Sequence, residues 1–256
     1  PRPSRALAAI HTLLRSAMTL VLARSGRECR EQGARRRREA LALGAGVAGL
    51  PAATLAQPAA GSARVLRYAF QVAESGFDPA RINDTYSRII TSHIYEALYR
   101  YDHLARPARI VPLTAAGMPE VSADFRTWTI RIQPGIHFAD DPVFKGQRRE
   151  LVAADYVYAF KRFVDPASKS PLWTSMSQWT MLGLTELREA ALSQKKPFDY
   201  DRPLEGLQAI DRYTLRFRLD AGRPRLDQLL TEAATGAVAR EVIEAHGELS
   251  MQHPVG

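Results

Sequence analysis

"IQPGIHFADDPVFKGQRRELVAADYVYAFKR" occupies residues 132–162. It begins at the end of an alternating segment, "TWTIRIQPG" at 127–135, whose apolar side chains fall on one face with the period of a strand. Gln133-Pro134-Gly135 breaks this alternation, and an acidic loop follows. Beyond the loop, apolar residues recur with helical spacing until Asp165-Pro166, which ends the pattern. The stretch therefore predicts a strand, a turn, a polar loop and an amphipathic helix, without catalytic groups. The inward residues are Trp128, Ile130 and Ile132 of the strand and Ala153, Tyr156, Val157, Phe160 and Val164 of the helix, with Asp155 in its first turn.

Three further segments carry a periodic pattern. "RVLRYAF" at 64–70 and "YTLRFRL" at 213–219 alternate as strands do. "YSRIITSHIYEALYRYD" at 86–102 has a single apolar stripe, which predicts one helix. Because strands and helices interleave along the chain, the fold class is α/β, in the sense of a mixed α+β domain. The helical stripe consists of Ile90, His93, Ile94, Ala97, Leu98 and Tyr101.

The net charge of +8 is unevenly distributed. Residues 1–56 hold ten arginines and three glutamates, which leaves 25 basic and 24 acidic residues for 57–256. A body that is nearly neutral lacks the clustered positive surface that phosphate backbones require, so we expect no nucleic-acid partner.

The basic N-terminal region has the order of an export signal. "RRRR" at 35–38 precedes a short apolar stretch and then small residues, which predicts a signal peptide over 35–56 with cleavage after Ala56. The arginines permit either the Sec or the twin-arginine route. Residues 1–34 are treated as an uncertain upstream extension. The single cysteine, Cys29, lies within this region, so the mature chain has no disulfide and no lipid-anchor cysteine, and we expect a periplasmic protein.

The sequence contains none of the common phosphate-binding, hydrolase or zinc motifs, and we expect neither a cofactor nor a metal. Asp140 and Asp141 leave open a secreted hydrolase that uses loop carboxylates, although a solvated turn explains them better. His93 is interpreted as a core residue, and His137 is a candidate for facing a cleft.

Trp173 and Trp179 frame "SPLWTSMSQW", a loop of polar and aromatic residues after the central helix. Amphipathic aromatic rings of this kind are typical of ligand-recognition surfaces. Simple packing under a loop explains them equally well, so both interpretations stay open.

The order of six segments resembles the extracellular solute-binding proteins of family 5. These segments are "GFDPARINDT", "IYEALYRYD", "IVPLTA", "SADFRTWTIRIQPGIHFADD", "LVAADYVYAFKRFVDP" and "AIDRYTLRFRL", and they cover about residues 64–220. Members of this family are periplasmic receptors that hand oligopeptides, dipeptides, nickel chelates and related solutes to ABC importers. The helix start departs from the family pattern, because Val152 stands where a capping Thr is usual.

The resemblance implies a periplasmic-binding-protein type II fold with two lobes that close on a ligand. It assigns 57–84 to the first segment of lobe I, 85–200 to an intervening domain and 201–256 to a truncated return segment of lobe I, with the second lobe largely missing. The expected function is capture of peptides or similar polar solutes by a monomer, without enzymatic activity, and delivery to an ABC permease. A non-functional truncated remnant is the other alternative. By position, the expected ligand contacts are Phe77, Thr85, Tyr86, Trp173 and Trp179.

Overall fold

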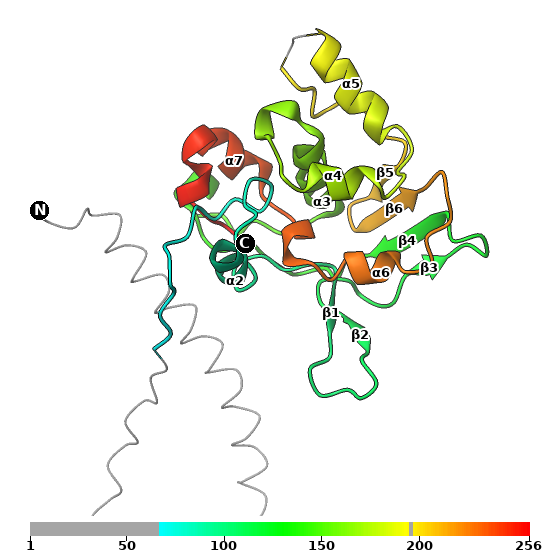
Figure 1. Cartoon of the computed structure of the whole chain (residues 1–256), viewed down its shortest axis with the longest axis horizontal. Helices are drawn as coiled ribbons and strands as arrows, with labels where there is room; N and C mark the ends of the chain where they lie inside the picture. The colour runs from blue at the N-terminus through cyan, green and yellow to red at the C-terminus, as the bar shows by residue number, and fades with distance from the viewer. Residues whose placement is uncertain (1–66, 195–196) are drawn as a thin grey trace, which may run out of the picture. The chain divides into compact units, whose positions relative to one another are not determined.

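The computed structural model describes residues 67–194 and 197–256, and residues 70–256 form one compact unit (Figure 1). The predicted signal peptide and the upstream extension lie outside the described residues. Within the described residues, no helix combines the length and the apolar character that a membrane span requires.

An antiparallel sheet of four strands forms the centre of this unit. Its order is β3 (Glu120–Val121), β4 (Thr127–Arg131), β6 (Thr214–Arg218) and β5 (Leu207–Asp211). β4 and β6 place apolar residues opposite one another, with Trp128 facing Phe217 and Ile130 facing Leu215. All four side chains are buried, which confirms the alternation predicted for both strands.

Helix α3 (Ala153–Val164) supplies the other half of the core. The ring of Phe160 lies edge-on to Phe217, with 5.5 Å between the ring centroids. The helix begins and ends where the sequence predicts. At its start the Asp155 carboxylate accepts a hydrogen bond of 2.8 Å from the backbone N–H of Val152, which is one half of a capping box, while Val152 itself offers no side-chain cap.

The face of α3 that was expected to be polar is also buried. Ten of its twelve residues are buried, because segments distant in sequence cover both sides of the helix. Lys161 is among them, and its Nζ donates to the backbone carbonyls of Tyr200 and Arg202 at 2.7 Å each. The sequence pattern thus predicted the apolar face of α3 but not the burial of its charged side chains, which bind partners inside the protein.

Shorter elements surround the sheet and α3. The helices are α2 (Thr85–Thr91), α4 (Trp173–Ser177), α5 (Leu184–Gln194), α6 (Leu226–Leu229) and α7 (Arg240–His246). A separate hairpin pairs β1 (Tyr99–Tyr101) with β2 (Ile110–Pro112). The 3₁₀ turns are η1 (Pro142–Phe144), η2 (Pro166–Ser168), η3 (Ala233–Thr235) and η4 (Gly247–Gln252).

Two predicted elements are wrong. No strand forms at 67–70, the described part of the predicted strand 64–70. The predicted helix 86–102 ends at Thr91 as α2, and the chain then continues as an extended segment into β1. Tertiary pairing decides this outcome, because the backbone carbonyl of Leu98 accepts a hydrogen bond of 3.0 Å from Leu113 N–H. His93, interpreted as a core residue, is exposed.

The predicted boundary between 200 and 201 does not separate two sheets. β4, from the segment expected to form an intervening domain, pairs along its whole length with β6, from the segment expected to return to lobe I. The predicted boundary at 84/85 also lies inside the compact unit 70–256. The assignment of these segments to named lobes stays a prediction.

A buried ion pair ties the loop before α2 to α3. The Nη1 and Nη2 atoms of Arg162 donate to the two oxygens of the Asp78 carboxylate at 2.6 and 2.5 Å. The side chains of Arg162 and Asp78 are 6% and 0% exposed. The carboxylate also accepts a hydrogen bond from Ala80 N–H at 3.1 Å. Such bidentate geometry is what a charge pair needs when it is removed from water.

Asp78→Asn should destabilise the fold by about 3–5 kcal/mol, because it leaves the Arg162 charge buried without a counter-ion. The free energy of urea unfolding of the full chain measures this loss. The double variant Asp78→Asn/Arg162→Met should be less destabilised than the sum of the single variants. A single cooperative transition of the unsubstituted chain would also argue against the remnant hypothesis.

A matched control is the exposed pair Arg88–Glu232, in which the side chains are 45% and 56% exposed. Glu232→Gln should change the free energy of unfolding by less than about 1 kcal/mol. Equal losses for Glu232→Gln and Asp78→Asn would contradict the role assigned to the buried pair.

Candidate functional site

The loop at 75–84 and the first turn of α2 form the first group of expected ligand contacts. Asp84 caps α2, because its Oδ1 accepts from Ser87 N–H at 2.8 Å. The Ser75 hydroxyl donates to the other oxygen of Asp84, and Ser75 N–H donates to Ser87 Oγ at 2.9 Å. Partial burial opposes ionisation of Asp84, but these hydrogen bonds outweigh it and lower its pKa to about 2. The turn is therefore rigid and carries a negative charge at neutral pH.

The three expected residues of this group differ in accessibility. Thr85 is exposed, and Tyr86 is half-buried with its ring centroid 4.9 Å from that of Phe70. Phe77 is only 6% exposed, and its backbone N–H donates to the Met251 carbonyl at 2.9 Å. Thr85 and Tyr86 thus lie together at the start of α2, whereas Phe77 is nearly buried and its backbone is bonded to the C-terminal segment.

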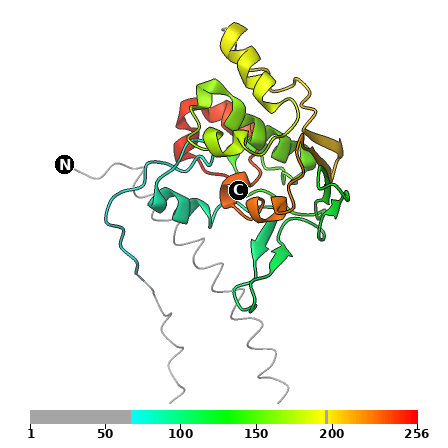
Figure 2. The same ribbon diagram turned by 45° about the vertical axis from the view of Figure 1, so that its right-hand side comes forward.

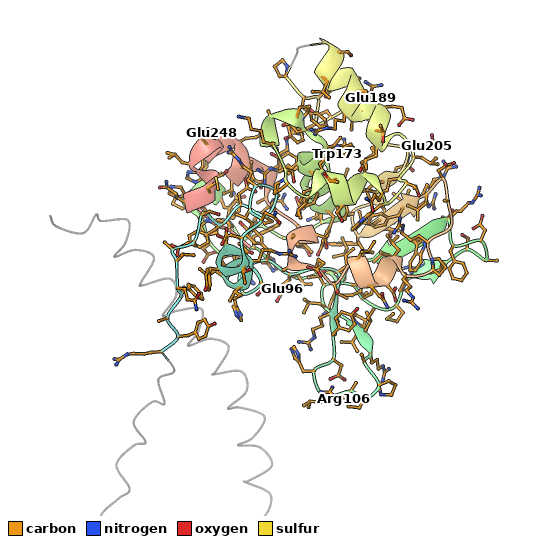
Figure 3. The ribbon with its side chains drawn as sticks, in the orientation of Figure 1. Glu96, Arg106, Trp173, Glu189, Glu205 and Glu248 are labelled. Carbon is orange, nitrogen blue, oxygen red and sulfur yellow. The ribbon has the colours of Figure 1, made fainter. Side chains whose placement is uncertain are left out.

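The two tryptophans belong to the region of α4: Trp173 is its first residue (Figure 3), and Trp179 follows two residues after its end. Trp173 is half-buried, with the guanidinium of Arg188 lying 4.7 Å from its ring centroid. Trp179 is 5% exposed and packs against Phe160 at 5.8 Å between centroids. Among the described residues, no hydrogen bond, ion pair or ring contact joins either tryptophan to Phe77, Thr85 or Tyr86. The packing interpretation therefore describes Trp179, while Trp173 keeps part of its surface accessible.

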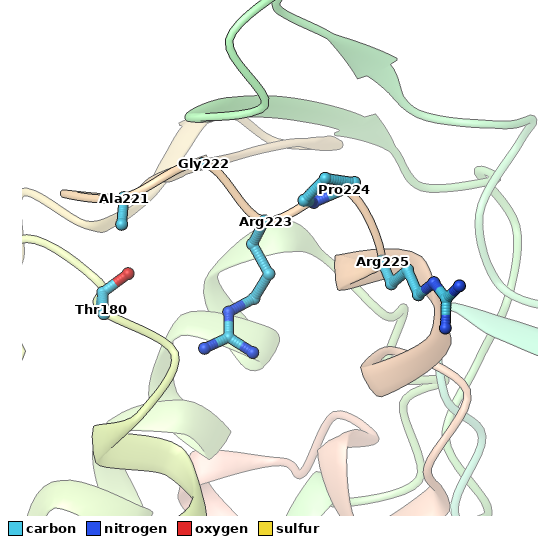
Figure 4. Close-up of a pocket in the computed structure, with 6 residues that line it drawn as sticks. All are labelled: Thr180, Ala221, Gly222, Arg223, Pro224 and Arg225. Carbon is cyan, nitrogen blue, oxygen red and sulfur yellow. The ribbon is translucent and has the colours of Figure 1, made fainter.

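An open hollow of about 360 Å³ lies elsewhere, between Thr180 and the loop 221–225 (Figure 4). Arg223 extends from this loop into the hollow and donates a hydrogen bond to the Gln178 carbonyl. The Thr180 hydroxyl is buried and has no hydrogen-bond partner within the described part of the chain. None of the five expected residues lines this hollow, and no sequence motif marked it. A second hollow, beside Arg162 and Phe163, is too narrow to admit a water molecule.

The loop carboxylates Asp140 and Asp141 do not converge on a common site: one caps a turn and the other is exposed. Asp141 caps η1 by accepting from Val143 N–H at 2.9 Å, and Asp140 is exposed. His137 is half-buried, with its Nδ1 2.9 Å from the Gly135 carbonyl. Within 67–194 and 197–256, no three His, Cys, Asp or Glu side chains gather as metal ligands would.

Sequence reasoning missed the charge clusters that fix these segments. Besides Asp78–Arg162, Arg149 binds Asp155 at 2.6 Å through Nη2 and Glu241 at 2.5 Å through Nε. Burial raises the pKa of Asp155, although the hydrogen bonds from Arg149 and the Val152 amide oppose this rise. Asp78–Arg162 and Arg149–Glu241 join residues 84 and 92 positions apart, so they leave no periodic signal in the sequence.

Comparison with known proteins decides the family. Residues 109–256, more than half of the chain, match the bacterial extracellular solute-binding proteins, family 5 Middle. The chain belongs to this family. Its fold is a mixed α/β part of the type II periplasmic-binding-protein fold, as the sequence resemblance implied.

Relatives of this family 5 chain include two peptide-binding proteins. It is 28% identical over 171 residues to the periplasmic oligopeptide-binding protein OppA of Escherichia coli K12, covering 67% of this chain and 28% of OppA. It is 34% identical over 116 residues to the di/tripeptide-binding protein 2 of Pseudomonas aeruginosa, covering 45% of this chain and 20% of the relative. The chain thus spans less than a third of the length of these relatives.

Solved structures give the same picture of the family 5 fold. The pheromone receptor PrgZ, in a structure that describes its mode of peptide binding, superposes with a TM-score of 0.52 at 27% identity, covering 69% of this chain and 31% of PrgZ. Haemophilus influenzae OppA in complex with the peptide RPPGFSPFR has a TM-score of 0.56 at 23% identity, with the same coverage. At that identity the second likeness concerns the fold alone.

The cap of α2 should make stability depend on pH. The lowered pKa of Asp84 means that its contribution is present above its unfolded pKa, near 4, and is lost as the pH falls through about 2. Asp84→Ala should lower the free energy of unfolding by about 1 kcal/mol at pH 6. This difference from the unsubstituted chain should shrink between about pH 4 and pH 2 in urea titrations. The neighbouring exposed Asn83→Ala is the control, and a similar loss for it would contradict the cap.

Gly222 should tolerate no side chain. A Cβ there would lie 2.2 Å from the Asp124 carbonyl oxygen, whereas a Cβ at Gly117 would meet nothing within 4 Å. Gly222→Ala should therefore cost about 1–3 kcal/mol through overpacking, and Gly117→Ala should stay within about 0.5 kcal/mol of the unsubstituted chain. Thermal unfolding of the two variants side by side measures this. Equal midpoints would mean that the loop at the hollow is not fixed as the structure has it.

Proposed function

We propose that this chain is part of a non-enzymatic periplasmic receptor that captures peptides and delivers them to an ABC permease. The observation that carries the proposal is membership of family 5, together with two relatives that are named for peptide binding. The relatives are binding proteins rather than enzymes, and no specific observation favours the hydrolase alternative based on Asp140 and Asp141.

The proposed mechanism is capture by closure of two lobes, in which ligand contacts favour the closed state and the closed state docks on the permease. The two hollows described above give it indirect support, because one is open to solvent and the other has no room for water. Ligand sites usually bury most of the ligand's surface. A peptide bound at the start of α2 or at Trp173 therefore needs a second wall from outside the described residues. This chain by itself should bind peptide only weakly.

Within this proposal, the exposed start of α2 is the first contact surface. Thr85 and Tyr86 offer a hydroxyl and an amphipathic ring on a turn that Asp84 holds rigid. Phe77 is nearly buried, with its backbone bonded to Met251, and Trp173 offers a second, half-buried ring. Trp179 takes part by shaping α4 from the core. Rigid placement of such groups lowers the entropy cost of binding.

The proposal keeps the export signal at 35–56, the Sec or twin-arginine route, the absence of a lipid anchor and the monomeric state. The export signal and its route are supported by the order of basic, apolar and small residues, and the lipid-anchor expectation by Gln57 and Pro58 at the predicted cleavage site, where a lipoprotein needs Cys. It also keeps the assignment of 57–84 and 201–256 to lobe I and of 85–200 to an intervening domain.

The test is a titration of the isotope-labelled chain with defined tri- to pentapeptides, followed by amide NMR shifts. We expect weak, saturable shifts that centre on the start of α2 and around Trp173, with intact peptide recovered afterwards. Tyr86→Ala should weaken binding about tenfold through the lost ring contact. Leu192→Ala, at a side chain that is 57% exposed on α5, should leave it unchanged. Shifts confined to other surfaces would refute the site, and peptide hydrolysis would refute the receptor.

A further inference from the structure

The hairpin β1–β2 projects away from the four-stranded sheet in two views that differ by 45° (Figures 1 and 2). Its base is anchored, because Tyr99 is fully buried and its hydroxyl donates to the Gly117 carbonyl at 3.3 Å. Its tip, residues 102–109, is mostly exposed, and Arg106 lies at its far end (Figure 3). The hairpin is therefore an arm with a fixed root and an accessible end.

The end of the arm combines apolar and basic side chains. Leu104 is 90% exposed, which makes it the most exposed large apolar side chain within the described residues. Tyr101 is 42% exposed at the end of β1. Arg100, Arg106 and Arg109 are all exposed, whereas Asp102 is the one acidic residue of the arm.

The register places alternate residues of β1 and β2 on the two opposite faces of the arm. Tyr101 pairs with Ile110 on one face, while Arg100 pairs with Val111 on the other. Asp102 N–H donates to the Arg109 carbonyl at 2.8 Å, which places Arg109 beside Asp102 beyond the last strand pair. Tyr101 and Ile110 thus share one face of the arm, and Arg100 and Arg109 lie on the other, with Leu104 and Arg106 in the connecting tip.

The tip is internally held. Arg106 Nη1 donates to the carbonyls of Ala105 and His103 at 2.7 and 3.1 Å, and Asp102 Oδ1 accepts from Leu104 N–H at 3.0 Å. These bonds present Leu104 outward without help from any other element. A held tip loses little conformational entropy when it meets a surface.

We propose that this arm is a contact for anionic phospholipid at a bilayer surface. Charge complementarity supports this choice, because the arm carries three arginines and only one aspartate. Each basic residue near an anionic leaflet strengthens binding about fivefold. Tyr and Arg side chains are suited to the headgroup layer, and an exposed Leu to the acyl boundary below it. Specific protein complexes usually bury at least about 1,200 Å² in total, which is far more than a loop tip of this size presents. The small area therefore favours a lipid surface over a protein partner.

The arm would hold the chain near a membrane whichever solute the receptor binds, so it is a function beyond peptide capture. Binding should be weak and reversible, because one leucine and three charges fall short of the two membrane signals that stable anchoring takes.

The experiment places a reporter at the tip. Leu104→Cys in a Cys29→Ser background is labelled with an environment-sensitive nitrobenzoxadiazole dye, and Leu192→Cys on α5 is the matched control. With vesicles of equal parts phosphatidylglycerol and phosphatidylcholine, the Leu104 label should shift to the blue and brighten, and the Leu192 label should not. Neither should respond to pure phosphatidylcholine. A silent Leu104 label on the anionic vesicles would overturn the proposal.

Charge variants separate the arm from the basic N-terminal region of the chain. Arg100→Gln/Arg106→Gln/Arg109→Gln should weaken vesicle co-sedimentation at least tenfold, and the corresponding Lys variant should restore most of it. A control that changes net charge equally, Arg126→Gln/Arg202→Gln/Arg225→Gln at exposed positions, should weaken it less than twofold. Equal losses in both Gln variants would refute a role for the arm. Peptide titration of the same variants is independent, so loss of peptide binding with intact vesicle binding would count only against the receptor.

Discussion

The ion pair between Asp78 and Arg162 is the constraint on which the arrangement of the described residues depends. A carboxylate with no exposed surface is tolerated only where a partner offers matched hydrogen bonds, and Arg162 does so with two nitrogens. Because Arg162 belongs to the central helix, the loop at 75–84 must lie against α3. The rest of that loop follows: Phe77 is buried, and Arg81 reaches Glu248 of the C-terminal segment at 2.9 Å.

The same logic explains why α3 is buried on nearly all sides. A helix that packs only one face on a sheet needs no internal partners for its charges. α3 instead binds Asp78 through Arg162 and two carbonyls of the 200–202 segment through Lys161, while Arg149 binds its first-turn Asp155. Each partner comes from a different part of the chain. The charged residues of this helix thus act as connectors that hold loops to the core, in addition to the apolar contacts with β4 and β6.

The sequence predicted the elements whose periodicity matches their burial. β4, β6 and α3 lie where alternation and helical spacing placed them, because the residues on their inner faces decide their packing. The helix expected at 86–102 failed at Ser92, since buried Leu98 and Tyr99 pair with the next strand instead of continuing a helical stripe. Of the candidate site, the proximity of Thr85 and Tyr86 was predictable from the chain. The burial of Trp179 and the pairing of Asp78 with Arg162 were not, because the first depends on packing with Phe160 and the second on a contact across 84 residues.

Within the proposed function, these observations also limit how a bound peptide can act on this chain. The loop before α2 is held on one side by a buried charge pair and on the other by the C-terminal segment, so rearranging it would expose Asp78 or Arg162 without a partner. The free energy needed to leave either charge buried and unpaired is large compared with the binding free energy of a weakly held peptide. In the proposed mechanism, a ligand at the start of α2 is therefore expected to move residues 70–256 as one body, with lobe closure at the connections of this unit to the other lobe. The projecting β1–β2 arm would move with it, since Tyr99 roots the arm in the same core.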